Sequence, residues 1–356
     1  MPRVKSGHMQ QIATYENCKI AIHDTLKGKT KSRRAKKIRS SIPRTAWRLK
    51  TVLESGTYKA HKMREFYVRD GAKRKVRHIT IPDLHSQFVH HAVFNVIGKT
   101  IEKRNYFYDC GNMSGKGCRL AIKRTKRLFA DKKNKYYAQF DVSKYYDSIP
   151  HKPLIWMLRN RITKDKPTLR LLWEIIKSSG KQGRGLAIGF YSSQYLAVLY
   201  LQGLDYKITQ EFAPGCGYVR YVDDGIIVGG NRRVLERALY LIENYLRTIG
   251  LRIKGVWKVR KIKERLAPFL GMRFGRGYVI MGKHIMYRIS RAARYAAGRK
   301  LTQHRASQLL SYWGTLKQCD SYNFRRTRFD TFVSISHCKE VMKNVHNRRR
   351  CTSGGV

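Results

Sequence analysis

Residues 217–228 read Gly-Tyr-Val-Arg-Tyr-Val-Asp-Asp-Gly-Ile-Ile-Val, two short apolar runs on either side of adjacent aspartates. This arrangement predicts a β-hairpin with Asp223 and Asp224 at its tip. Acidic residues are scarce in this chain, which has 23 Asp and Glu against 75 Lys and Arg. Two neighbouring carboxylates repel each other unless a cation neutralises them, and Mg²⁺ prefers hard oxygen ligands. The hairpin therefore predicts a magnesium site, with an ordinary solvated turn as the alternative.

The composition is that of a folded and strongly cationic protein. Of 356 residues, 42% are hydrophobic and 11% aromatic, so the chain can build a substantial core. The net charge of +52 favours a polyanionic partner, with nucleic acid first and a membrane surface or heparin-like polymer as the alternative. No apolar stretch approaches the ~20 residues that cross a bilayer. No secretory signal is visible either, so we expect a cytoplasmic protein without a membrane.

Cysteine and histidine predict no structural metal site. The seven cysteines are scattered without a C-x-x-C pair, which fits a reducing cytosol. His90 and His91 form an adjacent pair, but they fall in an apolar helical pattern where packing is the expected role.

Helical and strand-like patterns follow one another without regular β-α-β alternation, which predicts an α+β fold. Helical patterns cover the first fifty residues, 82–102, 118–130, 192–205, 232–250 and the chain from about 290 onward. Strand-like patterns cover 56–81, with Gly71 at a turn, then 136–142 and much of 251–274.

A partner for the two aspartates is expected at Asp141, which closes the apolar strand at 136–142. A two-metal phosphoryl-transfer centre needs carboxylates that approach from more than one element. Asp141 is therefore the candidate third ligand. Capping of the following helix is an alternative role that is compatible with metal binding.

Four ordered motifs make the chain resemble the palm of reverse transcriptases: FDVSKYYDSI at 140–149, IGFYSSQYLAVLYL at 188–201, RYVDD at 220–224 and FLGMRF at 269–274. The similarity runs from about 56 to 274. It implies a right-hand polymerase fold, with fingers, a palm of antiparallel sheet and helices, and a helical thumb. The expected divisions are a basic helical N-terminal extension (1–55), fingers (56–135), palm (136–284) and basic helical thumb and tail (285–356).

The resemblance also implies roles for individual residues. Asp141, Asp223 and Asp224 would carry two Mg²⁺ ions, with the carbonyl of Val142 as a further ligand. The dNTP pocket is expected to contain Lys75, Arg77, Tyr146, Ile188, Gly189, Gln194 and Lys258, and the primer grip Phe269, Leu270 and Gly271.

Two of these residues have a physical rationale of their own, and a third has only the role that the resemblance implies. Arg77 offers a planar fork to the triphosphate. Tyr146, five residues after Asp141, is the expected steric gate, because its ring would clash with a ribose 2′-hydroxyl and so favour dNTPs; a core aromatic is the alternative. By the resemblance, Lys258 falls near the lysine that would protonate pyrophosphate in these enzymes.

The motif at 188–194 indicates a type of reverse transcriptase. Most of these enzymes carry Gln-Gly, three residues and Ser-Pro, whereas this chain has Ile188-Gly189 and Ser193-Gln194. That pattern, together with SYWGTLKQCDSYNF at 311–324, resembles the bacterial or phage reverse transcriptases of diversity-generating retroelements. The resemblance implies copying of a template RNA with errors opposite adenine, an RNA/DNA hybrid as product and a small accessory protein as partner.

Isoleucine at position 188 cannot make the hydrogen bond of a glutamine amide, a contact worth ~0.5–1.5 kcal/mol. If correct base pairs depend on that contact more than incorrect ones, selectivity falls by up to about tenfold. Simple packing of Ile188 is the alternative. Two other functions stay open: a reverse transcriptase of a phage-defence or intron-like system, and a non-catalytic RNA-binding protein on a polymerase fold. Retention of all three aspartates argues against the last.

Overall fold

The structure is a computed structural model of the chain, and it describes residues 6–30, 32–61, 63–70, 75–111, 113–212 and 215–351. The side chains of residues 70, 75 and 344–351 lie outside this description. Helices and antiparallel strands are mixed along the chain, which confirms the expected α+β fold. No helix within the described ranges has the length and apolar character needed to cross a membrane.

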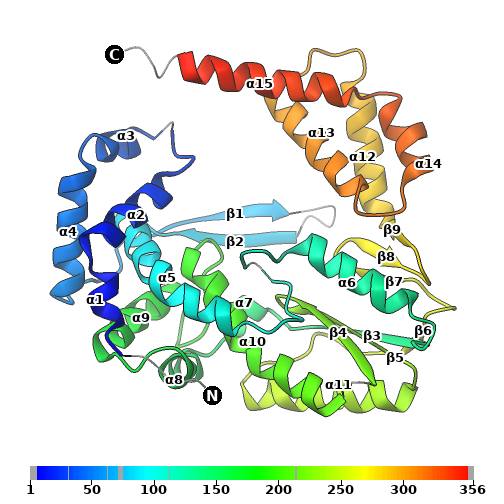
Figure 1. Cartoon of the computed structure of the whole chain (residues 1–356), viewed down its shortest axis with the longest axis horizontal. Coiled ribbons are helices and arrows are strands. Elements are labelled where there is room, and N and C mark those ends of the chain that lie inside the picture. Colours follow the sequence, from blue (N-terminus) through cyan, green and yellow to red (C-terminus); the bar gives the residue numbers. More distant parts are fainter. Residues whose placement is uncertain are drawn as a thin grey trace.

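The N-terminal region is helical, as expected, and lies beside the long helix α5 (Leu84–Arg104) (Figure 1). It contains α1 (His8–Ile12), α2 (Tyr15–Leu26), α3 (Arg33–Arg39) and α4 (Ile42–Glu54). The side chains of Thr14, Ser32 and Asp83 accept hydrogen bonds from first-turn amides and so fix the starts of α2, α3 and α5. Apolar side chains of α1, α2 and α4 share one core with α5, namely Ile12, Ile22, Leu53, Phe88 and Val93. These basic helices are therefore part of the folded body.

Strands β1 (Arg64–Asp70) and β2 (Lys75–Ile81) pair antiparallel in full register. The alternating pattern predicts a strand from residue 56, but the strand begins at Arg64, because Tyr58 is buried in the core instead of pairing in a sheet. The expected turn at Gly71 lies outside the described residues.

The central sheet has the strand order β4-β5-β3-β6 and is antiparallel throughout. Its strands are β3 (Tyr136–Asp141), β4 (Cys216–Tyr221), β5 (Asp224–Gly229) and β6 (Arg260–Lys261). Alternate side chains enter two different cores, as a pleated strand requires. Tyr137 and Ile226 pack beneath α6 (Cys118–Ala130), whereas Ala138, Phe140 and Ile227 join the core of α10 (Tyr191–Phe212) and α11 (Arg232–Thr248). Figure 1 shows α6 and α11 on opposite sides of this sheet.

Shorter elements connect these units. Helices α7 (Tyr145–Ser148), α8 (His151–Arg161) and α9 (Lys166–Ser179) lie between β3 and α10 in the chain. A second antiparallel sheet contains β7 (Ala267–Phe269), β8 (Met272–Phe274) and β9 (Val279–Met281). The segment 251–274 is thus less strand-rich than its pattern predicts, because much of it runs as irregular chain beside other elements.

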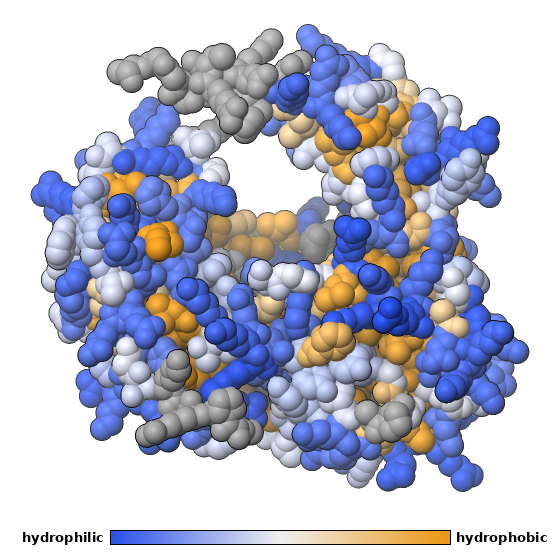
Figure 2. Space-filling model, viewed as in Figure 1, coloured by the Kyte–Doolittle hydropathy of each residue, from blue (hydrophilic) through white to orange (hydrophobic). Residues whose placement is uncertain are grey.

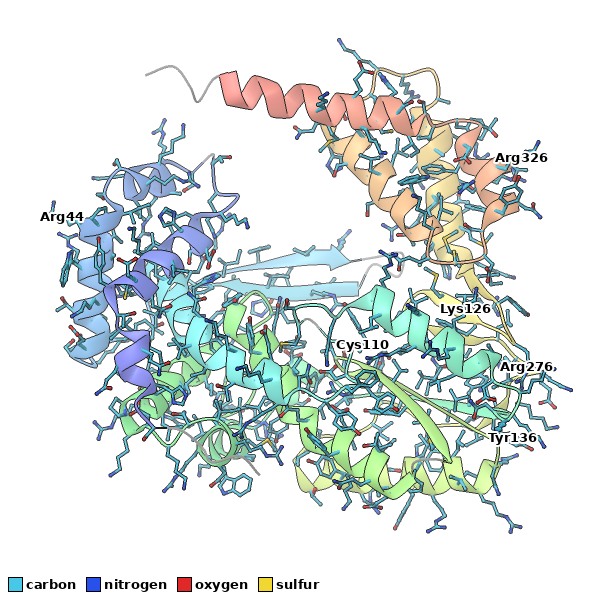
Figure 3. The ribbon with its side chains drawn as sticks, viewed as in Figure 1. Arg44, Cys110, Lys126, Tyr136, Arg276 and Arg326 are labelled. Atoms are coloured by element: carbon cyan, nitrogen blue, oxygen red, sulfur yellow. The ribbon has the colours of Figure 1, made fainter. Side chains whose placement is uncertain are left out.

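The C-terminal helices stand above the sheet as a separate group in Figure 1. They are α12 (Lys283–Ala296), α13 (Gln303–Leu316), α14 (Tyr322–Arg325), a π-helical turn at Arg326–Asp330 and α15 (Ile335–Cys351). Asp320 connects this group to the rest of the molecule: its Oδ2 lies 3.1 Å from Lys126 Nζ of α6 and accepts the Val279 amide at 2.7 Å. Figure 3 labels Lys126 just below these helices.

Candidate active site

The predicted hairpin forms, with Val222 and Asp223 as its turn. Strands β4 and β5 pair so that Tyr221 lies opposite Asp224. Val222 has a φ of 59°, a left-handed conformation that a β-branched side chain rarely adopts. Among the described non-glycine residues, positive φ also occurs at Lys144, Gln182 and Leu270. Val222, Lys144 and Leu270 all lie in segments that carry predicted site residues, where local strain tends to collect.

The register of the central sheet places Asp141 of β3 directly opposite Asp224 of β5. Side chains of such a cross-strand pair lie on the same face, with Cβ atoms ~4.5–5.5 Å apart. The Val142 amide donates to the carbonyl of Asp223 at 3.3 Å. The structure therefore brings together Asp141, Val142, Asp223 and Asp224, as the sequence predicts.

The carboxylates affect one another's charge. The pKa of Asp224 is raised to about 6, first by burial and then by the negative charges of Asp141 and Asp223. The ammonium of Lys254 opposes this shift. Its Nζ lies 2.8 Å from Asp141 Oδ2, and this hydrogen bond raises the pKa of Lys254 in turn.

Lys254, rather than Lys258, is therefore the lysine on the acidic cluster. The Lys254 amide also donates to the carbonyl of Asp141 at 2.8 Å, so residues 252–254 run alongside the end of β3. Lys258 is exposed, two residues before β6. No spacing rule indicated Lys254, because it lies in irregular chain whose path depends on tertiary contacts.

The chemistry of the three carboxylates fits a divalent metal. They are hard oxygen ligands, they come from two strands and a turn, and their mutual repulsion raises the pKa of Asp224. Their present arrangement is not a finished site, since no group of three His, Cys, Asp or Glu side chains in the described residues is arranged to hold a metal. Metal binding at Asp141 Oδ2 requires Lys254 to move away.

Tyr146 lies beside this cluster on α7. Its ring is half-buried, and its pKa is raised to about 12 by burial and by the nearby charge of Asp223. The carbonyl of Tyr146 accepts the Leu186 amide at 2.7 Å, which ties α7 to the chain before Ile188. The ring lies near Asp223, where a steric gate would be needed. The gating role of Tyr146 stays a prediction.

Ile188 and Gly189 pack against strand β2. The Thr80 amide donates to the Ile188 carbonyl at 2.9 Å. Gly189 has a φ of 117°, and a Cβ built there would lie 2.5 Å from the Thr80 carbonyl oxygen. Only glycine fits this close approach. Arg77 lies three residues before Thr80 on β2 and is half-buried.

Gln194 and Lys75 are two further residues predicted for the nucleotide pocket. Gln194 is exposed in the first turn of α10. The Lys75 side chain lies outside the described residues. His90 and His91 pack as the sequence indicates, with ring centroids 5.0 Å from Phe190 and 4.0 Å from Tyr191 respectively.

The predicted primer grip is a second tight hairpin. Leu270 and Gly271 connect β7 to β8, with φ values of 50° and 77° that match a type I′ turn. The Gln139 side chain, two residues before Asp141, donates to the Pro268 carbonyl. This contact connects the second hairpin to the strand that carries Asp141.

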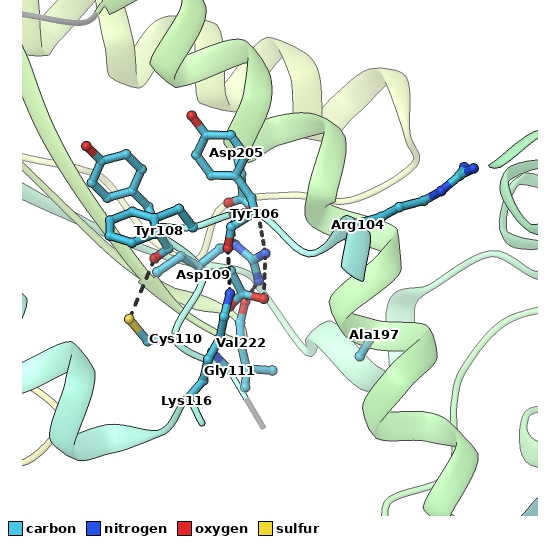
Figure 4. Close-up of polar contacts among 12 residues, drawn as sticks. Arg104, Tyr106, Tyr108, Asp109, Cys110, Gly111, Lys116, Ala197, Asp205 and Val222 are labelled. Atoms are coloured by element: carbon cyan, nitrogen blue, oxygen red, sulfur yellow. Dashed lines mark hydrogen bonds and ion pairs between the residues drawn. The ribbon is translucent and has the colours of Figure 1, made fainter. Parts of the chain in front are cut away.

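Sequence reasoning missed a buried ion network beneath the aspartates. Arg220 of β4 is fully buried, and it binds Asp205 of α10 through Nε at 2.7 Å and Nη2 at 2.5 Å. Asp109 Oδ2 lies 3.4 Å from Arg220 Nη2, and the Tyr218 hydroxyl donates to Asp205 at 2.8 Å. Figure 4 shows Asp109, Asp205 and Val222 gathered around this network.

Arg220 also supports the turn of the Asp223–Asp224 hairpin directly. Its Nη1 donates to the Val222 carbonyl at 2.6 Å, one residue before Asp223. Burial raises the pKa of Asp205, and the guanidinium of Arg220 opposes that shift. Because both partners are fully buried, the pair holds the turn without competition from water. Arg220 is therefore a positioning residue for Asp223.

Comparison with solved structures supports the same fold. Apo telomerase from Candida tropicalis aligns with a TM-score of 0.51 and 12% identity, over 83% of this chain and 59% of that chain. Telomerase from Candida tropicalis in complex with a TWJ fragment of telomeric RNA aligns with a TM-score of 0.51 and 13% identity, over 83% and 55%. At these identities the likeness shows the fold alone, and the chain spans 55–59% of the length of those proteins.

Sequence comparison shows the family. No curated protein matches the chain significantly. The sequence profile described as reverse transcriptase (RNA-dependent DNA polymerase) matches residues 64–274, which is more than half of the chain and includes all three aspartates. With a matching profile, a right-hand polymerase fold and the carboxylates of β3 and β5 face to face, the chain belongs to the reverse transcriptase family.

Proposed function

We propose that this protein is an RNA-directed DNA polymerase that adds dNTPs to a primer in a two-metal centre. The observation that carries the proposal is the pairing of Asp141 with Asp224, with Asp223 on the adjoining turn. These carboxylates and the Val142 carbonyl would hold two Mg²⁺ ions, which when bound activate the primer 3′-hydroxyl and stabilise the leaving pyrophosphate.

The surrounding residues would bind and orient the nucleotide. Arg77, with Lys75 nearby, would grip the triphosphate from β2, and Tyr146 would exclude a ribose 2′-hydroxyl beside Asp223. Ile188, Gly189 and Gln194 would line the nucleotide pocket. Lys254 contacts Asp141 and is a stronger candidate than Lys258 for the lysine that reaches the phosphates. Residues 269–271 would hold the primer end.

Template RNA and the RNA/DNA hybrid are the proposed polymeric ligands. The net charge of +52 supports a polyanion, and Figure 2 shows an opening bounded by the N-terminal helices, the C-terminal helices and the β1–β2 pair. In this assignment residues 56–135 are fingers, 136–284 palm and 285–356 thumb. The N-terminal extension at 1–55 would support the fingers, since its helices α1, α2 and α4 pack on α5.

We further propose that the enzyme is the error-prone type of bacterial or phage diversity-generating retroelements, in which a small accessory protein is a partner. Support comes from Ile188, whose backbone is fixed by Thr80 while Gly189 lets β2 approach closely. The side chain at position 188 therefore has a defined place beside the strand that carries Arg77. An isoleucine there leaves the pocket without an amide.

The polymerase proposal is tested by primer extension on an RNA template with dNTPs and Mg²⁺. We expect extension by the wild type and none by Asp223→Asn, with both proteins binding the template-primer. Absence of activity in the wild type, or equal activity in the variant, would support a non-catalytic RNA-binding protein instead.

The fidelity proposal is tested by sequencing cDNA made by Ile188→Gln. We expect misincorporation opposite template adenine to fall by up to about tenfold. Ile188→Leu is the matched control, because it keeps an apolar side chain of similar volume and should keep the wild-type error spectrum. An unchanged spectrum in Ile188→Gln means that Ile188 only packs.

A further inference from the structure

A second candidate ligand site lies at the opposite end of β3 from the aspartates. A hollow of about 480 Å³ is lined by Lys132, Lys135, Tyr136, Lys261, Lys263 and Arg276. Tyr136 begins β3, and Asp141 ends it, so five residue steps of ~3.3 Å separate the hollow from the acidic cluster. Figure 3 labels Tyr136 and Arg276 at the outer edge of the sheet, away from the central opening.

The lining concentrates positive charge around one aromatic ring. Its lysines and arginine come from the loop before β3, from β6 and the residues after it, and from the loop after β8. Among the described residues, no carboxylate lines the hollow. The flanking acids have partners of their own: Glu264 binds Lys261 at 2.7 Å, and Asp131 accepts the Lys133 amide at 2.9 Å. Like charges held this close are unfavourable unless a polyanion binds among them.

Arg276 is held in place before any ligand arrives. Its Nη1 donates to the Asp131 carbonyl at 2.8 Å and its Nη2 to the Asn134 carbonyl at 2.5 Å. Its Nε is buried and has no hydrogen-bond partner among the described atoms. Tyr136 is fixed too, because its backbone pairs with Gly229 and Lys261 on either side. The hollow therefore has an ordered floor, formed by Arg276 and Tyr136, with exposed lysines around it.

We propose that this hollow binds single-stranded nucleic acid outside the polymerase cleft, with phosphates on the lysines and one base on the Tyr136 ring. A cationic groove with an aromatic platform is how proteins bind single strands without sequence preference. An aromatic ring among cations favours a nucleobase with its phosphates over an acidic peptide, and a duplex would not enter a hollow of this size. The flank of a long template RNA is the expected occupant, held while its copied region lies in the cleft.

The proposal is tested by the salt dependence of binding to a fluorescent single-stranded RNA of ~20 nucleotides. The protein is first saturated with an unlabelled RNA/DNA hybrid, so that the cleft is filled. Lys135→Gln/Lys263→Gln should lower the slope of log affinity against log salt by about 1.4, twice the ~0.7 expected per contact with a single strand. Lys152→Gln/Lys177→Gln, on exposed positions of α8 and α9, removes the same charge and should leave the slope unchanged.

Variants at Tyr136 separate stacking from charge. Tyr136→Leu should weaken RNA binding by about tenfold at an unchanged slope, whereas Tyr136→Phe should bind like the wild type. Thermal unfolding checks that both variants are folded. A DNA strand of the same sequence that binds equally well identifies the displaced or product strand as an equal ligand of this site.

Two results would overturn the proposal. One is an equal loss of slope in the pocket and control lysine pairs, which would mean a general effect of charge. The other is wild-type affinity in folded Tyr136→Leu. Primer extension on a short template-primer should be normal in Lys135→Gln/Lys263→Gln, so a failure of this site is distinguishable from a failure of the polymerase.

Discussion

The two ends of strand β3 carry opposite charge. At one end Asp141 meets Asp224 and Asp223, with Lys254 as a nearby cation. At the other end the Tyr136 ring is surrounded by lysines and Arg276. Like charges raise the free energy of each end until a counter-charge arrives. The comparison teaches that one strand can prepare a site for a metal cation and a site for a polyanion, separated by the uncharged stretch 137–140.

The two ends also differ in how firmly they are built. The turn at the acidic end is held by Arg220, which is fully buried, whereas the basic end is formed mainly by exposed lysines. A metal site tolerates little displacement of its ligands, while a chain of phosphates can be held by flexible cations. The buried support at the acidic end therefore suits the metal ions that we propose there, and the exposed lysines at the basic end suit the proposed nucleic acid.

The largest effect is expected from breaking the acidic end. Asp141→Asn or Asp223→Asn should reduce primer extension by about 1000-fold or more, because a ligand of the proposed metals is lost. Affinity for single-stranded RNA should be unchanged, since the basic end is intact. Residual activity within about tenfold of the wild type would remove these residues from the catalytic centre.

The next effect concerns the support of the acidic end. Arg220→Met should lower the free energy of unfolding by about 3–5 kcal/mol, because it leaves Asp205 and Asp109 buried without their cation. Denaturant titration measures this loss. Arg276→Lys is the matched change at the basic end and should cost only about 1 kcal/mol, the value of a hydrogen bond near the surface. Equal losses would contradict the difference in burial.

A third prediction uses pH. The pKa of Asp224 in the folded protein is raised to about 6, against ~3.9 for a free aspartate. Between these two pH values, the folded metal-free protein therefore keeps a proton on Asp224 that the unfolded chain has released. Stability from this group therefore falls as pH rises through that window and is constant above about 6. Metal binding has the opposite dependence, and Mn²⁺ affinity should weaken about tenfold per unit of pH below about 6.

A variant that keeps all three carboxylates provides the control for this titration. Lys254→Met removes a positive charge that lowers the pKa of Asp224, so the loss of Mn²⁺ affinity should begin at higher pH. If Mn²⁺ affinity falls over the same pH range in the variant as in the wild type, Lys254 does not influence the pKa of Asp224.

The smallest effect is expected from the same lysine at about pH 8, where Asp224 is ionised. Lys254→Met should bind Mn²⁺ up to about fivefold more tightly, because Asp141 Oδ2 is no longer occupied by the ammonium. The effect is small because the pair is largely exposed, and such pairs are worth ~0–1 kcal/mol. Weaker binding in the variant would show that Lys254 assists the metal rather than competing with it.

Local patterns predicted a large part of the fold. The basic helix at 118–130 and the hairpin around 223–224 agree with the structure, because apolar periodicity and turn residues act over short distances. The pairing of Asp141 with Asp224 could also be expected, since a two-metal site needs carboxylates from more than one element. The roles assigned to Arg77, Tyr146 and Ile188 stay predictions.

Contacts that depend on distant segments could not be predicted. Asp109, Asp205 and Arg220 read as ordinary charged residues in a chain rich in them, and their burial depends on α10 crossing β4. Lys254 reaches Asp141 through irregular chain that has no pattern. The alternating pattern at 56–63 wrongly predicts a strand. Alternation reflects which side chains are buried, and Tyr58 is buried in the core without being part of a sheet.

The attachment of the C-terminal helices has a kinetic consequence. Asp320 connects them to α6 through Lys126, and both side chains are about half exposed, so dissolved ions screen this contact. Added salt should then act in two ways: it releases phosphates, and it weakens this ion pair, although the apolar contacts between the same helices and α6 remain. The length of cDNA made in one encounter should shorten more steeply with salt than the affinity for the hybrid declines.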